Sequence, residues 1–343
     1  MKLKQTALAV AMSALGFGVA NQAHAYVYAG SGLSIDDLTI LVTQNGTTPS
    51  LNVTVNSFNF TLTNTAFLNG VGVATNATCG GTPALNTCAA SPAPPADALP
   101  ANAPGGTTIR ANNATTVNSF TFFQPAAGGD WSNSDSVINT AQLVDGVPTS
   151  TDQIAEALLN NGATASANAE IQSLTGFTFN FDVLAPGTLL LNFLADPDMQ
   201  AQISGELAGI YNAQSNMNVS FSLQQNTGGN GAASWTPQGT GANDCADVGG
   251  VICTELADTE DLNINLGVST NNTTESNSFA PGVLGNGAYG ISVAGLTTGN
   301  WTLTLNALTS VTLTRQVPEP GMLALLGASL LGVGAVARRR KSK

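Results

Sequence analysis

The chain has 343 residues, of which only 9% are charged, and its formal net charge is −12. All 21 acidic residues lie between positions 26 and 320, where Arg110 and Arg315 are the only basic residues, so this stretch carries a formal charge of −19. A surface this acidic repels nucleic acid, and we expect no nucleic-acid partner. The stretch also holds no histidine and no lysine, which excludes Ser-His-Asp, Cys-His and Ser-Lys catalysis. We therefore expect a protein that is not an enzyme, with no catalytic residue.

The N-terminus has the three parts of a secretory signal peptide. Two lysines supply the positive start, residues 7–20 are largely apolar, and Ala23 and Ala25 form a small-x-small cleavage site. We predict a signal peptide over residues 1–25, export through the secretory translocon, and cutting after Ala25 by signal peptidase.

Apolar and polar residues alternate along much of the body, residues 26–316. Alternation places one face of a strand on a core and the other in solvent, which is typical of antiparallel sheets. The phase of the pattern shifts between Val55 and Phe58, and pairs such as Asn69-Gly70 mark turns. The pattern predicts an all-β, antiparallel β-sandwich-like body. The alternating residues are Leu51, Val53 and Val55; Phe58, Phe60 and Leu62; Phe177, Phe179 and Phe181; Val219, Phe221 and Leu223; Leu262, Ile264, Leu266 and Val268; Trp301, Leu303 and Leu305; and Val311 and Leu313.

Residues 89–106 are of low complexity and rich in proline. This composition is typical of an extended loop or linker. It either divides the body into a small N-terminal unit and a larger C-terminal one, or is a long surface insertion within one sandwich, which we favour slightly.

The four cysteines form two local pairs, Cys79 with Cys88 and Cys245 with Cys253. An even number of cysteines in an exported chain indicates disulfides, and we predict one within each pair. Pairing between the two loops stays an alternative. Zinc would need shorter spacing or histidines, which the mature chain lacks.

We expect one or two short helices beside the strands. Ser150 and Gln153 have the spacing of a capping box, and Ile154, Ala157 and Leu158 would share one helical face. A second short helix is expected to begin at Asp196-Pro197, because proline is favoured at the first helical position.

Carboxylates are the remaining candidates for acid–base chemistry or metal binding. Paired carboxylates suit a polysaccharide hydrolase, although solvated acidic loops are the simpler interpretation. No stretch has the spacing of an EF-hand, so we predict no metal site and no cofactor from motifs. A calcium site between β-loops stays an open alternative because the body is so acidic. The candidates are Asp196, Asp198, Asp244, Asp247, Glu255, Asp258, Glu260 and Asp261.

A carbohydrate-binding module is a further alternative. Such a module would need exposed aromatic anchors, for which Trp131, Trp235 and Trp301 are candidates. Trp301 suits a core position equally well because it begins an alternating strand.

The C-terminus again has three parts. Val317-Pro318-Glu319-Pro320 is a short polar motif, residues 321–337 carry no charge, and a basic tail, residues 338–343, ends the chain with Arg338, Arg339, Arg340 and Lys341 at its start. Seventeen helical residues span about 25 Å, against a bilayer core of about 30 Å. We therefore predict a short transmembrane helix over residues 321–337, with the basic tail as a stop on the cytoplasmic side.

Together with the signal peptide, Pro318-Glu319-Pro320 and residues 321–343 resemble the sorting signal of PEP-CTERM proteins. These are exosortase substrates of Gram-negative bacteria that make extracellular polysaccharide. The resemblance covers under a tenth of the chain. It implies exosortase as a partner, transient insertion into the inner membrane, cleavage near the motif, and a final place at the cell surface or in its matrix. We expect a structural or adhesive role in exopolysaccharide, floc or biofilm.

Overall fold

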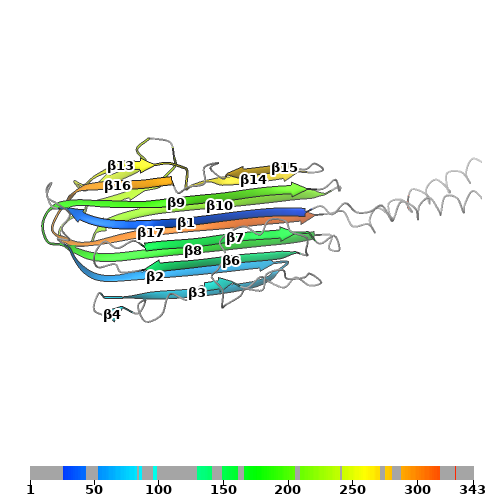
Figure 1. Cartoon of the computed structure of the whole chain (residues 1–343), viewed down its shortest axis with the longest axis horizontal. Coiled ribbons are helices and arrows are strands. Elements are labelled where there is room, and N and C mark those ends of the chain that lie inside the picture. The colour runs from blue at the N-terminus through cyan, green and yellow to red at the C-terminus, as the bar shows by residue number, and fades with distance from the viewer. Residues whose placement is uncertain are drawn as a thin grey trace, which may run out of the picture.

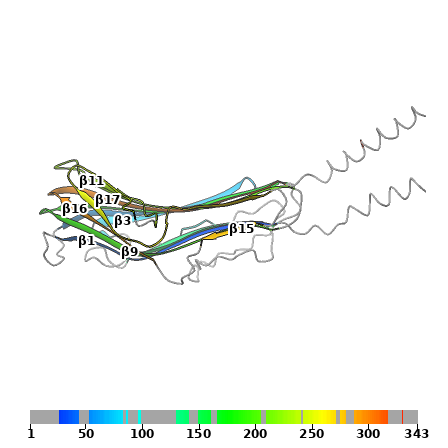
Figure 2. The same ribbon diagram turned by 90° about the horizontal axis from the view of Figure 1, so that it is seen from above.

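The computed structural model is a sandwich of two antiparallel sheets, elongated in Figure 1 and seen as two layers in Figure 2. This confirms the predicted all-β, antiparallel class. No helix among the residues described is long and apolar enough to cross a membrane. The structure describes residues 26–43, 53–82, 85–86, 96–98, 130–140, 149–160, 166–204, 209–239, 242–270, 275–279, 287–316 and 329.

The first sheet has the strand order β13-β16-β9-β1-β7-β6-β5, and β15 also pairs with β9. Its strands are β1 (Tyr26–Thr43), β5 (Ala96–Ala98), β6 (Trp131–Thr140), β7 (Thr149–Leu159), β9 (Gly187–Ser204), β13 (Ile252–Asp258), β15 (Glu275–Phe279) and β16 (Gly287–Leu296).

The second sheet has the order β12-β11-β10-β17-β8-β2-β3-β4, and β14 also pairs with β10. Strands that precede and follow residues 89–106 pair with one another in both sheets. The strands of this sheet are β2 (Val53–Leu68), β3 (Val71–Thr82), β4 (Leu85–Asn86), β8 (Ser166–Val183), β10 (Ile210–Gln225), β11 (Ala232–Trp235), β12 (Cys245–Val248), β14 (Asn265–Thr270) and β17 (Gly299–Gln316).

The alternating residues face the interior as the sequence predicts. Phe60 on β2 stacks on Phe177 on β8 with ring centroids 4.9 Å apart, and both side chains are buried. The shift of phase after Val55 is a bulge in β2, where the register with β8 changes between Val55 and Ser57. The Asn69-Gly70 turn joins β2 to β3 with φ positive at both residues, as a two-residue hairpin requires.

A belt of buried polar side chains separates two apolar clusters inside the sandwich. Asn64 on β2 donates to Ser136 Oγ at 2.8 Å and accepts from Ser134 Oγ at 3.0 Å, and both serines lie on β6 in the facing sheet. Ser31 on β1 and Ser215 on β10 each donate to a backbone carbonyl of the other strand, at 2.9 and 2.6 Å. These hydrogen bonds join the two sheets where small polar residues replace apolar ones.

The helix predicted from Ser150 and Gln153 is wrong, because these residues belong to β7. The strand lies between β1 and β6, where Ala157 packs inside the sandwich and Ile154 and Leu158 are buried on the opposite face. Residues 154–159 are buried on both faces and are apolar except for Glu156, so their apolar positions include the spacing of a helical face.

The second predicted helix, at Asp196-Pro197, is also wrong, because both residues lie within β9. Pro197 pairs with Leu33 of β1 on one side. On the other side, β16 reaches β9 only as far as Ala195, and β15 begins its pairing at Met199. Among the described residues, β9 thus has β1 as its single neighbour at Pro197, and a residue without an N–H tolerates such a position.

The body begins and ends at the same end of the sandwich. Tyr26, the first residue of β1, pairs with Ser204, and Gln316, the last residue of β17, pairs with Ile210. Only residues 205–209 connect these two pairs, and Figure 1 shows β1 starting where β17 finishes. We call this the terminal end of the sandwich.

Candidate functional site

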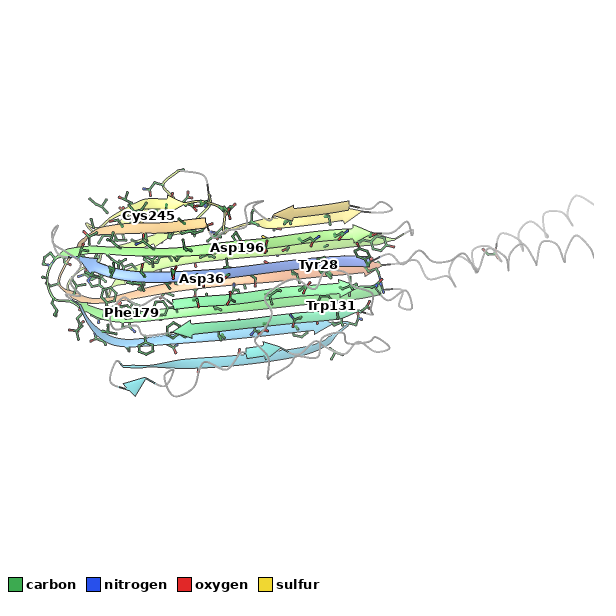
Figure 3. The ribbon with its side chains drawn as sticks, in the orientation of Figure 1. Tyr28, Asp36, Trp131, Phe179, Asp196 and Cys245 are labelled. Carbon is green, nitrogen blue, oxygen red and sulfur yellow. A yellow bond between two sulfur atoms is a disulfide. The ribbon has the colours of Figure 1, made fainter. Side chains whose placement is uncertain are left out.

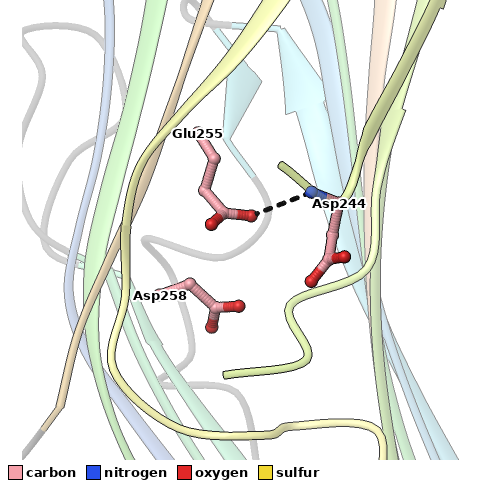
Figure 4. A group of neighbouring side chains, drawn as sticks. All are labelled: Asp244, Glu255 and Asp258. Carbon is pink, nitrogen blue, oxygen red and sulfur yellow. Dashed lines mark hydrogen bonds between the residues drawn. The ribbon is translucent and has the colours of Figure 1, made fainter. Parts of the chain in front are cut away.

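Three carboxylates meet at one edge of the sandwich, away from the terminal end. Asp244 precedes β12, whereas Glu255 and Asp258 lie on β13, and one oxygen of each lies within 4.8 Å of the others. Figure 4 shows the three side chains converging. All three are half-buried. The sequence placed them among eight candidate carboxylates, and the fold selects these three as a group, which we call the carboxylate triad.

The connection between β12 and β13 positions the triad. The two strands belong to different sheets and are joined by a turn at Gly249 and Gly250, whose φ angles are +72° and +88°. Cys245 and Cys253 form a disulfide across this connection, with their Cα atoms 5.7 Å apart. The disulfide confirms the second predicted pair and links the edges of the two sheets beside the triad. The other predicted pair, Cys79 with Cys88, lies outside the described residues.

Backbone and indole N–H groups hold two members of the triad. Glu255 Oε2 accepts from Trp235 Nε1 at 2.9 Å and from the backbone N of Asp244 at 3.3 Å. Asp258 Oδ2 accepts from the backbone N atoms of Gln238 at 2.9 Å and Gly239 at 2.6 Å. The sequence analysis named neither Gln238 nor Gly239 and named Trp235 only as a candidate surface anchor, because backbone N–H groups and a single indole leave no sequence pattern.

Two oxygens of the triad have no hydrogen-bond donor among the described residues. These are Asp244 Oδ2 and Asp258 Oδ1, and both atoms are buried. Burial raises the pKa of Asp258 above its usual value, the Gly239 and Gln238 N–H groups oppose that rise, and the charges of Glu255 and Asp244 add to it. Arg315, the one arginine among the described body residues, is the second-last residue of β17, at the terminal end. The triad therefore concentrates negative charge with no basic side chain of the described body beside it.

Further carboxylates lie on the outer face of the first sheet. Burial raises the pKa of Asp198, and the charge of Asp196 raises it further. Burial also raises the pKa of Glu260, and the charges of Asp196 and Asp198 add to this rise. The labelled Asp196 and Asp36 in Figure 3 mark this face. Glu260 thus approaches the two aspartates of β9 across the surface.

The remaining two candidate carboxylates accept hydrogen bonds from backbone N–H groups. Asp247 Oδ2 accepts from the N–H of Cys253 at 2.8 Å, and Asp261 Oδ1 accepts from the N–H of Asn263 at 2.7 Å. These hydrogen bonds shape the loops around β13, and neither residue belongs to the triad.

The three candidate tryptophan anchors are buried. Trp131 is 3% exposed, Trp235 1% and Trp301 0%. The indole of Trp235 donates to Glu255, and that of Trp301 donates to the Thr297 carbonyl at 3.0 Å. None of them offers a ring to a ligand on the surface, so the expectation that they act as exposed anchors is wrong.

Most of the predicted sorting elements lie outside the described residues. This holds for the signal-peptide residues Ala23 and Ala25, for the motif at 317–320, and for the basic residues at 338–341. Within residues 321–337 the structure describes Ser329 alone, which is helical and exposed.

Comparison with known proteins finds a sorting motif at the C-terminus. The family model described as the PEP-CTERM protein-sorting motif matches residues 316–341. A search of curated proteins found no match. Among solved structures, one described as the structure of infectious bursal disease virus Gx strain aligns over 87% of this chain and 82% of its own, at 11% identity and a TM-score of 0.09, which carries no argument about fold or function.

Proposed function

We propose that this chain, which carries a PEP-CTERM sorting motif, is an exported protein that exosortase processes and that serves a structural or adhesive role in the extracellular matrix. The observation that carries the proposal is the match at residues 316–341, which begins at the last residue of the sandwich. The signal peptide would bring the body across the inner membrane, and the apolar segment 321–337 would hold it there until cleavage, with the basic tail in the cytoplasm.

The boundary between sandwich and motif supports such processing. β17 pairs with β8 and β10 up to Gln316, so every strand of the body precedes the motif. Cleavage within or after Val317–Pro320 would therefore remove the apolar segment and leave the sheets intact.

Several properties of the body support a matrix role. Its second sheet carries mostly uncharged polar residues on the outer face, such as the row Ser222, Thr304 and Thr178 across three neighbouring strands. Uncharged hydroxyl and amide groups suit contacts with hydrated polysaccharide. The strands of 18 residues in β1, β8, β9 and β17 make a rigid body about 60 Å long at about 3.3 Å per residue.

Mass spectrometry of the native extracellular protein tests this proposal. We expect an N-terminus at Tyr26 and a C-terminus close to Pro320. The double variant Pro318→Ala/Pro320→Ala should accumulate uncut in the inner membrane. Processing and localisation of that variant as in the parent would show that the motif is not an address.

We also propose that the carboxylate triad binds calcium. Hard cations prefer oxygen ligands, and Asp244 Oδ2 and Asp258 Oδ1 are two such atoms without donors beside a third carboxylate. Calcium would offset the mutual repulsion of the three charges. The bound ion would also stiffen the edge of the sandwich formed by β12 and β13. Titration calorimetry with calcium on the folded body tests this second proposal. The absence of binding heat, together with a melting temperature that chelator does not change, would contradict it.

A further inference from the structure

We propose that, before cleavage, the sandwich stands upright on the membrane with its terminal end against the lipid headgroups. The inference rests on the proposed function, in which residues 321–337 span the inner membrane. It adds which surface of the body meets the lipid and which surface is held away from it.

The first argument is the short distance between sheet and membrane segment. Gln316 is the last residue of β17, and it pairs with Ser166 on one side and Ile210 on the other. Four residues, 317–320, separate it from the apolar segment. At about 3.5 Å per extended residue these reach about 14 Å, far less than the length of the sandwich. The terminal end therefore cannot move far from the membrane.

The second argument is the stiffness of that end. Arg315 is 1% exposed, and its Nη1 lies 3.9 Å from Asp130 Oδ1. Asp130 directly precedes β6 in the facing sheet, and it also accepts from the backbone N of Asn160, which directly follows β7, at 2.7 Å. The last residues of β17 are thus joined to both sheets. A rigid central strand that leads into a short connection fixes the direction of the body better than a flexible linker does.

The third argument is the distribution of charge. Glu170 is exposed and lies opposite Thr312, close to the terminal end, and Glu275 begins β15 opposite Ile203. The other described carboxylates that are not buried lie at least six residues, or about 20 Å, from the terminal end of the sandwich. Figure 3 shows the same polarity, with Tyr28 and Trp131 near the terminal end and Cys245 towards the opposite one. These distant carboxylates are Asp36, Asp37, Asp152, Asp182, Asp196, Asp198, Asp244, Asp247, Glu255, Asp258, Glu260 and Asp261.

This distribution distinguishes an upright body from one that lies on the outer face of its first sheet. The potential of an anionic headgroup surface decays over a Debye length, about 8–10 Å at physiological salt. Carboxylates at about 20 Å or more feel little of it when the body is upright. A body lying on the outer face of its first sheet would bring Asp36, Asp196 and Asp198 into the headgroup layer, where like charges repel. Charge thus disfavours a body lying on that face.

The fourth argument is apolar exposure at the terminal end. Ile210, the partner of Gln316, is 55% exposed, and Val71, at the start of β3, is 42% exposed. Apolar side chains next to a membrane-inserted segment gain free energy by entering the interface. The upright body would therefore rest on Ile210, with Val71 close to the headgroups, and would hold the carboxylate triad toward the outside.

Fluorescence quenching in vesicles tests the orientation. The full-length precursor is reconstituted into vesicles of phosphatidylethanolamine and phosphatidylglycerol that contain a headgroup spin-labelled lipid. Single variants Ile210→Trp, Val71→Trp and Leu184→Trp are compared with the parent, whose own tryptophans are buried. Leu184 is the matched control, because it is 63% exposed and lies between β8 and β9 at the opposite end. Equal melting temperatures show that each variant folds.

We expect the spin label to quench the fluorescence added by Ile210→Trp, to a lesser degree that of Val71→Trp, and to leave that of Leu184→Trp unchanged. Equal quenching at positions 210 and 184 would mean a body lying flat, and no quenching at either would mean a body held off the lipid. Either result overturns the inference. Flotation with the vesicles reports separately on the membrane segment, because a precursor that does not float contradicts the proposed function itself.

Discussion

The carboxylate of Asp247 accepts a hydrogen bond from the backbone N–H of Cys253 at 2.8 Å. Two residues along β13, the N–H of Glu255 donates to Asn243 Oδ1 at 3.2 Å. β13 is the edge strand of the first sheet, so two of its N–H groups that would face a further strand are occupied by side chains. Capped edges resist pairing with another chain, which an exported β-protein at high local concentration needs.

Removing this cap should expose the edge. We expect Asp247→Ala to lower the free energy of unfolding by about 1 kcal/mol, the usual net contribution of a hydrogen bond. It should also promote self-association, measured by light scattering beside chemical denaturation. Asp247→Asn is the matched control, because it keeps an acceptor oxygen without the charge. Scattering from Asp247→Ala no greater than from the control would contradict the protective role.

The disulfide is the next determinant of this edge. Cys245 and Cys253 are separated by 8 positions, and closing so short a loop contributes about 2–3 kcal/mol in the chain-entropy model. The double variant Cys245→Ser/Cys253→Ser should lose about that much free energy of unfolding. Reduction of the parent should cause a similar loss in thermal denaturation. A loss near zero from both treatments would show that hydrogen bonds alone hold the β12–β13 connection.

Alternation made most strands predictable from the sequence. In a strand such as β17, with one face in the core and one in solvent, apolar and polar residues alternate along the sequence. Even the bulge of β2 after Val55 was visible as a shift in the phase of this alternation. β7 failed for the opposite reason, because a strand covered on both faces has no alternation to read. Pro197 led to a wrong prediction of a helix start. Whether a strand tolerates a proline depends on the strands that flank it at that position, which is a property of the whole sheet.

The carboxylate triad was predictable only in part. Asp244, Glu255 and Asp258 were recognisable as acidic residues, but Asp247 and Asp261 were equally good candidates. The difference between them arises because β12 and β13 lie in different sheets and the turn and disulfide bring their flanks together. Trp235 was read as a surface anchor, whereas its indole supports Glu255 from the core.

Calcium binding predicts a selective effect of charge removal at the triad. We expect calcium to raise the melting temperature of the parent and to have little effect on Asp258→Asn or Asp244→Asn, because each loses a ligand carboxylate. Asp37→Asn is the control, since Asp37 is exposed outside the triad and its φ of 53° suits asparagine. Differential scanning calorimetry with calcium and with chelator measures the shift. If calcium raised the melting temperature of the parent and the three variants equally, the calcium site would not be the carboxylate triad.

The raised pKa values predict how stability of the calcium-free body depends on pH. Burial and neighbouring carboxylates raise the pKa of Asp258, Asp198 and Glu260 in the folded state, and burial is the largest cause for Asp152 too. A carboxylate with a raised folded pKa binds its proton more tightly when folded, so its contribution is fully present below the unfolded pKa, about 4, and is lost as the pH rises through the folded value.

In chelator, the free energy of unfolding should therefore increase when the pH is lowered from 7 through the folded pKa values of these groups to the unfolded value of about 4. Asp258→Asn should flatten this rise, because the amide does not titrate. Calcium should flatten it as well, since a bound cation keeps the triad ionised without the repulsion. Urea denaturation at a series of pH values, with chelator and with calcium, measures both effects. A calcium-free body that loses stability steadily from pH 7 downward would contradict the assignment of these carboxylates as mutually repelling.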